Sequence, residues 1–282
     1  MPPEIRFEKR PSQQFGRANG ARRAPLSSPL ILYKKMKLYK YRPINKFSIQ
    51  ILINKKIWYA KPTSFNDPFD CGIDLDSNLS LEEKVEVLKF KMFQEGWSPQ
   101  KVKQQLIYSF NSQGELNDKA ENNILKIYDE VYQKRDNTGV LSLSSKNSEM
   151  LMWSHYADSH KGLCLEIEVE ENSNTISRVK YSEDIPKHTL HDIFIKRDTN
   201  IFDLLITKHI DWDYENEYRI ILDRGNLLHN LPGKITSVIF GLKTPNNEIE
   251  EIKKIASENL PDVKFKKCIK SKVKFEILIE NV

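Results

Sequence analysis

The segment Leu163–Val169 (LCLEIEV) alternates apolar and acidic residues, the pattern of a β-strand with one buried face. Other short apolar segments predict strands at Lys37–Arg42, Ile57–Ala60, Val140–Ser144, Glu217–Leu222 and Ile235–Phe240. Helical spacing of apolar residues predicts helices at Phe47–Ile53, Glu149–Ala157, Leu190–Thr207 and Asn247–Glu258. This mixture predicts an α+β fold with a mixed, mainly antiparallel sheet and flanking helices.

A helical insertion is predicted at about residues 80–135. Ser80 and Glu83 form a capping-box pattern, Ser98-Pro99 begins a second helix, and a third covers Asn117–Gln133. We expect these helices to pack on the sheet and see no chemistry in them. At the end of the chain, Val263–Ile279 alternates like a closing hairpin. Its lysines are expected to protect an edge strand, at positions 264, 266, 267, 270, 272 and 274.

The net charge of +5 lies in the leading segment. Residues 1–35 hold eight Lys/Arg and two Glu, or +6, which leaves 36 basic and 37 acidic residues, or −1, in the rest. We predict a disordered basic tail or extension at residues 1–35 and a single α+β domain at 36–282. Because the body is nearly neutral, the basic composition is no evidence for a DNA-binding body, and nucleic acid as a partner stays open.

Composition also limits the location of the protein. No apolar run approaches the roughly 20 residues that span a bilayer, and no apolar signal core opens the chain. Cys71, Cys164 and Cys268 are far apart and odd in number, as expected for reduced thiols. We therefore predict a cytoplasmic protein with no membrane partner.

Polar residues follow the predicted strand Ile57–Ala60 in the loop KPTSFNDPFD, residues 61–70. The loop offers short polar groups on a backbone fixed by two prolines, as binding loops do: Ser64, Asn66, Asp67 and Asp70. The alternative is a structural turn anchored by its phenylalanines.

The second candidate segment runs from Leu141 to Glu166 and includes MWSHYADSH, residues 152–160. Aromatic side chains beside histidine and serine suit a stacked base or nicotinamide. The candidates are Ser144, Trp153, His155, Tyr156 and His160. A zinc site from His155, His160 and Cys164 lacks a fourth ligand at a recognisable spacing, so no metal site is predicted. A core helix with a capped end is the alternative.

The third candidate segment is KHIDWDYENEYRI, residues 208–220, which supplies Lys208, Glu215, Glu217 and Arg219. On a strand, Glu217 and Arg219 point to one face, and burying either charge alone is costly. They form either a paired structural network or a cleft in which a carboxylate polarises a ribose hydroxyl.

Several common catalytic signatures are absent from the sequence. It contains no Walker A loop, no Rossmann glycine fingerprint, no GxSxG elbow and no HExxH motif, and it has only ten glycines. P-loop hydrolysis, Rossmann dehydrogenation and classical hydrolase chemistry are therefore not expected.

Four motifs in order resemble a bacterial family known as domain of unknown function 2971. They are YKYR at Tyr39–Arg42, WYAKPTSFNDPFD at Trp58–Asp70, MWSHYADSHKGLCLE at Met152–Glu166, and Lys208 with WDYENEYR at Trp212–Arg219. The helical insertion matches none of the motifs. The resemblance implies a role in abortive-infection or other anti-phage defence, possible contact with a phage or defence-system protein, and no particular reaction.

The order of elements is also similar to that of ADP-ribosyltransferases. Lys40 or Arg42 would be the anion anchor, and Tyr59 or Ser144 the residue on a second strand. Tyr59, Trp153 and Tyr156 would stack on the ligand. Glu217, with Glu215 and His155, would be catalytic, and NAD the cofactor or substrate.

Two other hypotheses remain open. One is a metal-dependent nuclease using Asp67, Asp70, Glu166 and Glu217 with Lys208. The other is a non-enzymatic sensor that binds a nucleotide, another small molecule or a phage protein in the same cleft.

Overall fold

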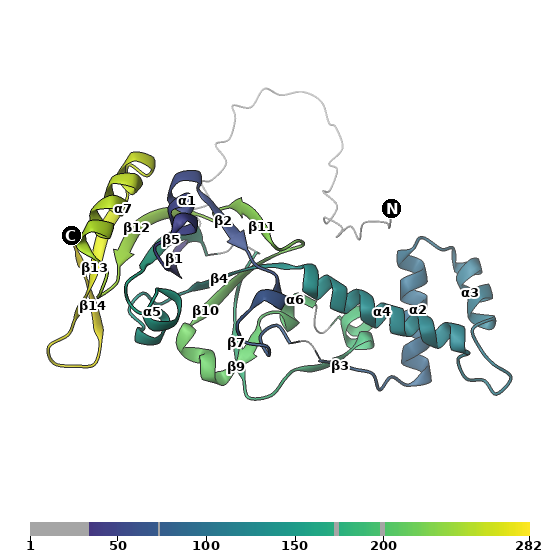
Figure 1. Cartoon of the computed structure of the whole chain (residues 1–282). Coiled ribbons are helices and arrows are strands. Elements are labelled where there is room, and N and C mark those ends of the chain that lie inside the picture. The colour runs from purple at the N-terminus through teal and green to yellow at the C-terminus, as the bar shows by residue number, and fades with distance from the viewer. Residues whose placement is uncertain (1–33, 73, 172–174, 198–200) are drawn as a thin grey trace, which may run out of the picture. The chain divides into compact units, whose positions relative to one another are not determined.

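The computed structural model describes residues 34–72, 74–171, 175–197 and 201–282. Within these ranges eight strands form one sheet: β1 (Lys35–Arg42), β4 (Gly139–Ser144), β5 (Leu163–Glu170), β6 (Ile176–Arg178), β10 (Glu217–Leu222), β12 (Lys234–Phe240), β13 (Lys264–Lys270) and β14 (Ile277–Asn281). Their order is β14-β13-β12-β5-β1-β4-β10-β6 (Figure 1). Neighbours are antiparallel except β12 and β13, which confirms the predicted α+β fold with a mixed, mainly antiparallel sheet.

Helices cover both faces of this sheet. One face packs against α1 (Lys46–Asn54) and α7 (Asn246–Asn259) in the largest apolar core. The other face packs against α5 (Met150–Tyr156) through Met152 and Trp153 (Figure 1). Along β1, Leu38 enters the first core and Tyr41 the second, as the alternation of side chains on a strand requires.

The predicted helical insertion consists of α2 (Leu81–Gln94), α3 (Pro99–Ile107) and α4 (Asp118–Asn137). Ser80 and Glu83 form the predicted capping box on α2. The expectation that these helices pack on the sheet holds only at one margin of their core. They pack on one another and on residues 190–205 in a separate core, with Ile221 of β10 at its margin. In Figure 1, α4 leads from the end of β4 towards α2 and α3.

The predicted helix Leu190–Thr207 is confirmed only in part, because it is not one continuous helix. The described residues there form a π-helical turn at Asp192–Lys196, a short α6 (Ile201–Leu204) and β9 (Thr207–His209). Strand β9 pairs in parallel with β7 (Lys180–Ser182), and Arg197 has a positive φ of 57°. The left-handed Arg197 therefore ends the first helical turn, and the strand β9 begins at the last residue of the predicted helix.

The described residues form two more small sheets of two strands each. Strand β3 (Asp74–Asp76) pairs with β8 (Lys187–Thr189), and β2 (Lys56–Tyr59) pairs with β11 (Leu227–Asn230).

The predicted C-terminal hairpin exists as β13 and β14, but the edge of the sheet is β14. Four of the six lysines lie on β13, which pairs on both sides, and Lys272 and Lys274 lie in the connecting loop. Protection of an edge strand therefore does not explain these lysines, and that expectation is wrong.

The described residues from Lys34 to Val282 form one compact unit. The predicted disordered tail lies, up to residue 33, outside the described residues, and Lys35 already begins β1. In the described part of the chain, we find no helix with the length and apolar character needed to cross a membrane.

Candidate functional site

A cavity of about 170 Å³ lies where strands β1 and β4 separate. Strand β1 pairs with β5 over eight residues, whereas its described pairing with β4 is the single pair Tyr39–Ser144. The Nζ atom of Lys40 donates to the carbonyl of Ser142 at 2.8 Å across this opening. We call the cavity the Glu215 pocket. It is lined by Tyr39, Lys40, Tyr41, Phe65, Asn66, Asp70, Ser142, Leu143, Ser144, Met152, Tyr156, Lys208, Glu215 and Glu217.

Two carboxylates enter this pocket from one short segment. A 3-10 helix, Ile210–Glu215, ends at Glu215, and Glu217 begins β10. Between them Asn216 has a φ of 44°, a left-handed conformation that asparagine tolerates better than most residues. The hydroxyl of Ser144 donates to the Glu215 carbonyl at 2.6 Å, which holds this turn against β4.

Arg219 anchors the inner wall of the pocket and is completely buried. Its guanidinium donates to both oxygens of Asp70 at 2.7 and 2.8 Å and to both oxygens of Glu217 at 2.8 and 3.0 Å. It also donates to the carbonyl of Leu205 at 2.6 Å and to the sulfur of Cys71 at 3.1 Å. One arginine thus joins the loop before β3, the end of α6 and strand β10.

Lys208, on β9, is the second buried cation. Its Nζ atom lies 2.6 Å from Glu215, 3.3 Å from Glu217 and 3.4 Å from Asp70. Burial disfavours the ammonium form, but these three carboxylates outweigh it and raise the pKa of Lys208. The lysine is therefore a fixed positive charge between the two glutamates.

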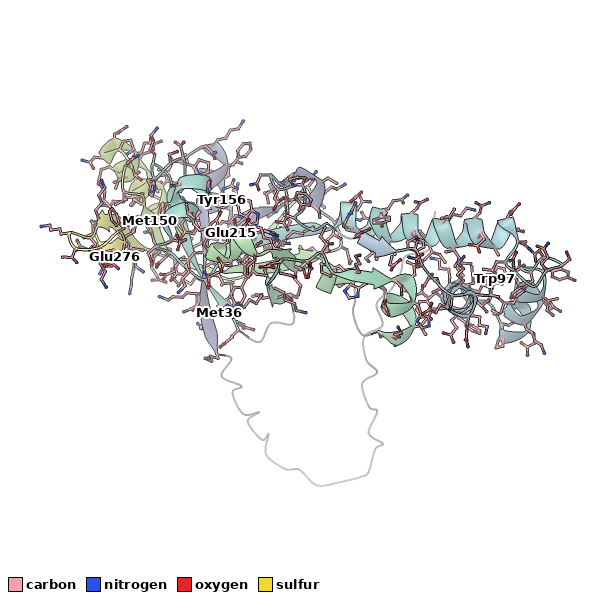
Figure 2. The ribbon with its side chains drawn as sticks, turned by 90° about the horizontal axis from the view of Figure 1, so that it is seen from below. Met36, Trp97, Met150, Tyr156, Glu215 and Glu276 are labelled. Carbon is pink, nitrogen blue, oxygen red and sulfur yellow. The ribbon has the colours of Figure 1, made fainter. Side chains whose placement is uncertain are left out.

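The pKa values of the two glutamates are shifted in opposite directions. Burial favours the neutral form of both, and for Glu217 the charges of Arg219 and Lys208 win and lower its pKa to about 2. For Glu215, burial and the charge of Glu217 win over Lys208, and its pKa lies above the ordinary value of 4.5. The hydroxyl of Tyr156 donates to Glu215 at 2.7 Å, and Figure 2 shows these two side chains close together. Glu215 is thus the carboxylate of the pair whose pKa is raised, which suits it to accept and release a proton.

The ammonium group of Lys40 has hydrogen-bond donors that no described protein atom accepts. In the described structure its ammonium has the Ser142 carbonyl as its hydrogen-bond partner and no carboxylate within ion-pair distance, while an ammonium has three donors. Burial, and then the charge of Arg42, lower the pKa of Lys40 to about 8. It remains mostly protonated at pH 7 and can bind an oxygen of a ligand.

The structure brings most of the third predicted segment into the pocket. Lys208, Glu215 and Glu217 line it directly, and Arg219 lies behind them. From the other segments, Lys40, Asn66, Ser144 and Tyr156 also line it.

Four predicted residues of the first half of the chain lie outside the pocket lining. Arg42 is at the far end of β1 opposite Leu163, and burial lowers its pKa. Tyr59 is buried in the main core, edge-on to His229. The hydroxyl of Ser64 donates to the Lys61 carbonyl, and Asp67 accepts from the backbone N–H of Phe69.

Three predicted residues of the helix α5 region also lie outside this lining. Trp153 is fully buried against Tyr41 and donates to the Asn147 carbonyl. His155 is exposed, with its ring centroid 6.2 Å from that of Tyr156. His160 lies in another cavity.

Sequence reasoning missed several residues of the pocket. Tyr39 and Ser142 line it from the separating strands, Met152 from α5, and Phe65 from the loop, with its ring centroid 5.8 Å from Arg219. The sequence predicted Asp70 as a polar loop residue and as a nuclease carboxylate, but not as a partner of Arg219. The periodicity of β1 and the FNDPFD motif hint at Tyr39 and Asp70, but no local pattern pairs Asp70 with Arg219, 149 residues away.

The carboxylates of the nuclease hypothesis are divided between separate places. Asp70 and Glu217 are paired with Arg219, Asp67 is outside the pocket, and Glu166 pairs with Lys37 and Lys266 in a different cavity. Over residues 34–282, apart from the short undescribed gaps, no group of three or more His, Cys, Asp or Glu residues is arranged to hold a metal ion.

Comparison with known proteins adds a family match. Residues 152–220 match the family model DUF2971. The model is described as "Protein of unknown function", and it supports the predicted resemblance over this quarter of the chain. The DUF2971 match spans Tyr156, Lys208, Glu215, Glu217 and Arg219, whereas the motifs at Tyr39–Arg42 and Trp58–Asp70 lie outside it. No curated protein and no solved structure matches the chain.

Gly162, in the matched segment, allows close packing between the end of α5 and β1. A Cβ atom on Gly162 would collide with the Arg42 carbonyl and come within 2.9 Å of the Ala157 carbonyl. The absence of a side chain therefore lets the end of α5 lie directly against β1.

Proposed function

We propose that the Glu215 pocket binds one ring of NAD or a related nucleotide and that the chain is an ADP-ribosyltransferase-like enzyme. The observation that carries this proposal is the contrast between two neighbouring carboxylates in one pocket. Burial raises the pKa of Glu215, whereas the charges of Arg219 and Lys208 hold Glu217 ionised. Groups with pKa values pushed apart in one pocket are a common arrangement for acid–base chemistry.

The size of the pocket limits the part of the ligand that it takes. At about 170 Å³ it is smaller than the roughly 300–1,000 Å³ of pockets that enclose a whole ligand. It suits a single ring such as nicotinamide, with the rest of the nucleotide outside. Tyr39, Phe65 and Tyr156 offer aromatic surface to that ring, and Lys40 offers donors to its carboxamide oxygen.

The chemistry assigns different roles to the two glutamates. The bond between ribose C1′ and the nicotinamide nitrogen breaks, nicotinamide leaves with the bonding electrons, and positive charge develops on the ribose. The negative charge of Glu217 stabilises that charge. The acceptor's hydroxyl or amine then bonds to C1′, and its proton passes to Glu215.

Incubation with NAD labelled in its ADP-ribose part tests this function. We expect label on protein or nucleic acid, or free ADP-ribose when water is the acceptor, with release of nicotinamide. Glu215→Gln should lower the rate roughly 100-fold or more, the lower range for loss of an acid–base group. Glu251→Gln, an exposed position on α7, is the matched control and should retain the wild-type rate.

Unaltered NAD would contradict the enzymatic proposal. Thermal stabilisation by NAD without turnover would instead support the sensor hypothesis. Divalent-metal-dependent cleavage of a nucleic acid that persists in Glu215→Gln would support the nuclease hypothesis.

The anti-phage role remains a prediction from the family resemblance. We expect bacteria that express the chain to reduce phage plaque formation and bacteria that express Glu215→Gln not to do so. Equal plaque counts for the two strains would contradict a role of the Glu215 pocket in defence.

A further inference from the structure

A second cavity lies at the C-terminal hairpin and shares no lining residue with the Glu215 pocket. It has a volume of about 550 Å³ and is lined by Met150, His160, Leu242, Lys243, Lys270, Ser271, Lys272, Val273, Lys274, Phe275, Glu276 and Ile277. We call it the hairpin pocket. Two of its lining residues, Met150 and Glu276, are labelled in Figure 2.

The hairpin pocket carries positive charge that the fold does not neutralise. Within the described residues, Lys243, Lys270, Lys272 and Lys274 have no ion-pair partner and no side-chain hydrogen bond, and Glu276 is the one acidic residue of the lining. The cavity around Glu166 differs, because Lys37 and Lys266 pair with Glu166 there. The chain after residue 35 has a net charge of −1, so four lysines at one cavity are a local feature.

Exposed apolar side chains alternate with these lysines. Phe275 is 98% exposed and Val273 is 86% exposed, and both lie in the lining. Neither contributes to a core, and the lysines beside them do not protect the edge strand, which is β14. Folding therefore explains neither the aromatic ring nor the charge.

The wall opposite the hairpin has a strained backbone. Asp158, Ser159 and His160 have consecutive positive φ angles of 48°, 51° and 72°. Such runs of non-glycine residues are costly and are found most often at functional sites. The His160 carbonyl accepts from the Lys243 N–H at 2.9 Å, which holds this turn against the pocket. The imidazole Nδ1 of His160 is buried and has no hydrogen-bond partner among the described residues.

We propose that the hairpin pocket binds single-stranded nucleic acid. Lysines that lack protein partners can neutralise backbone phosphates, and an exposed phenylalanine can stack on an unpaired base of any sequence. A small free anion would use the lysines but not Phe275. Paired bases in a duplex present no face to stack on, and a bilayer surface is held by a larger apolar face than two side chains provide.

Fluorescence anisotropy with a short labelled oligothymidine tests this proposal on the full chain. We compare the wild type with the triple variant Lys270→Gln/Lys272→Gln/Lys274→Gln. The matched control is Lys119→Gln/Lys126→Gln/Lys254→Gln, which removes the same charge from exposed helical positions. The hairpin variant should weaken binding and reduce the slope of log affinity against log salt by about 2, or roughly 0.7 for each lost phosphate contact.

Phe275→Ala provides a second readout. Because Phe275 is almost fully exposed, its replacement leaves the core intact. We expect binding to weaken roughly 5- to 150-fold, the range for loss of one stacked base, with no change in the salt slope. A change in slope but not in affinity would contradict the stacking role.

Three results would overturn the proposal. They are no binding by the wild type, equal weakening in the control triple variant, and binding to phosphatidylserine vesicles or duplex DNA in preference to the oligothymidine. NAD turnover is measured on the same variants, whose substitutions leave the Glu215 pocket untouched. Failure of oligothymidine binding therefore does not depend on the outcome for the NAD reaction.

Discussion

Glu217 and Glu215 are two residues apart and enter the same pocket, but they belong to different surroundings. Glu217 lies on a strand and is bonded to a completely buried arginine. Glu215 ends a 3-10 helix and contacts a tyrosine and a lysine at the cavity. Burial is similar for both, at 3% and 4% exposure, so their charged partners account for the opposite directions of the two pKa shifts. The comparison separates a wall whose charge the fold fixes from a wall that can take part in proton transfer.

Arg219→Met should have the largest effect. It removes the fork that joins Asp70, Glu217 and Leu205 and leaves two buried carboxylates with only Lys208 as a cation. Breaking a buried ion pair in this way costs about 3–5 kcal/mol. Urea unfolding should show this loss. Arg224→Met, an exposed arginine in the loop after β10, should stay within about 0.5 kcal/mol of the wild type.

Acid unfolding provides the next comparison. The folded pKa of Glu217, about 2, is below its ordinary value of 4.5, so its contribution is complete above about pH 4.5 and is lost as the pH falls towards 2. The difference corresponds to roughly 3 kcal/mol. The unfolding free energy of Glu217→Gln should therefore fall less steeply than that of the wild type between pH 4.5 and 2. An unchanged acid slope would mean that Glu217 is not held ionised.

Tyr156→Phe acts on the other wall. In the wild type, the hydrogen bond from Tyr156 lowers the pKa of Glu215. The substitution removes this bond, so the pKa of Glu215 should rise further. We expect a loss of about 1.5–3 kcal/mol in unfolding free energy and a shift of the pH–rate profile for NAD conversion to higher pH. A lower unfolding free energy with an unmoved pH profile would indicate that Tyr156 only supports the fold.

The turn between the two glutamates should give the smallest effect. Asn216 has a φ of 44°, so Asn216→Ala should cost about 1–2 kcal/mol and Asn216→Gly much less. Thermal unfolding of the two variants measures this difference. Equal losses would show that the amide group of Asn216 matters and not its backbone conformation.

Strong local signals in the sequence predicted much of the fold. The bounds of β10 and the capping box of α2 follow from alternation and from side-chain capping, which depend on neighbours in the chain. The same alternation predicted that Glu217 and Arg219 share a face, and their hydrogen bonds agree. By the same alternation, Lys40 and Arg42 share one face of β1. The cavity lies where β1 and β4 separate, however, and Arg42 lies outside its lining.

The remaining features depend on contacts between distant residues. Strands of three residues such as β7 and β9 are too short for a period to appear. The left-handed residue Arg197, which interrupts the predicted helix at Leu190–Thr207, has no signal in the sequence either. Asp70 meets Arg219 only through the fold. Whether Glu215 or Glu217 has the raised pKa depends on the position of Arg219, and no local pattern in the sequence predicts that position.

The most direct test is a carboxyl-carbon NMR titration of the glutamates, with Glu215→Gln and Glu217→Gln to assign the two signals. We expect Glu215 to titrate above 4.5 and to respond to added NAD, and Glu217 to titrate near 2. A Glu215 signal that titrates below 4.5, or one indifferent to NAD while Glu217 responds, would contradict the division between the two walls.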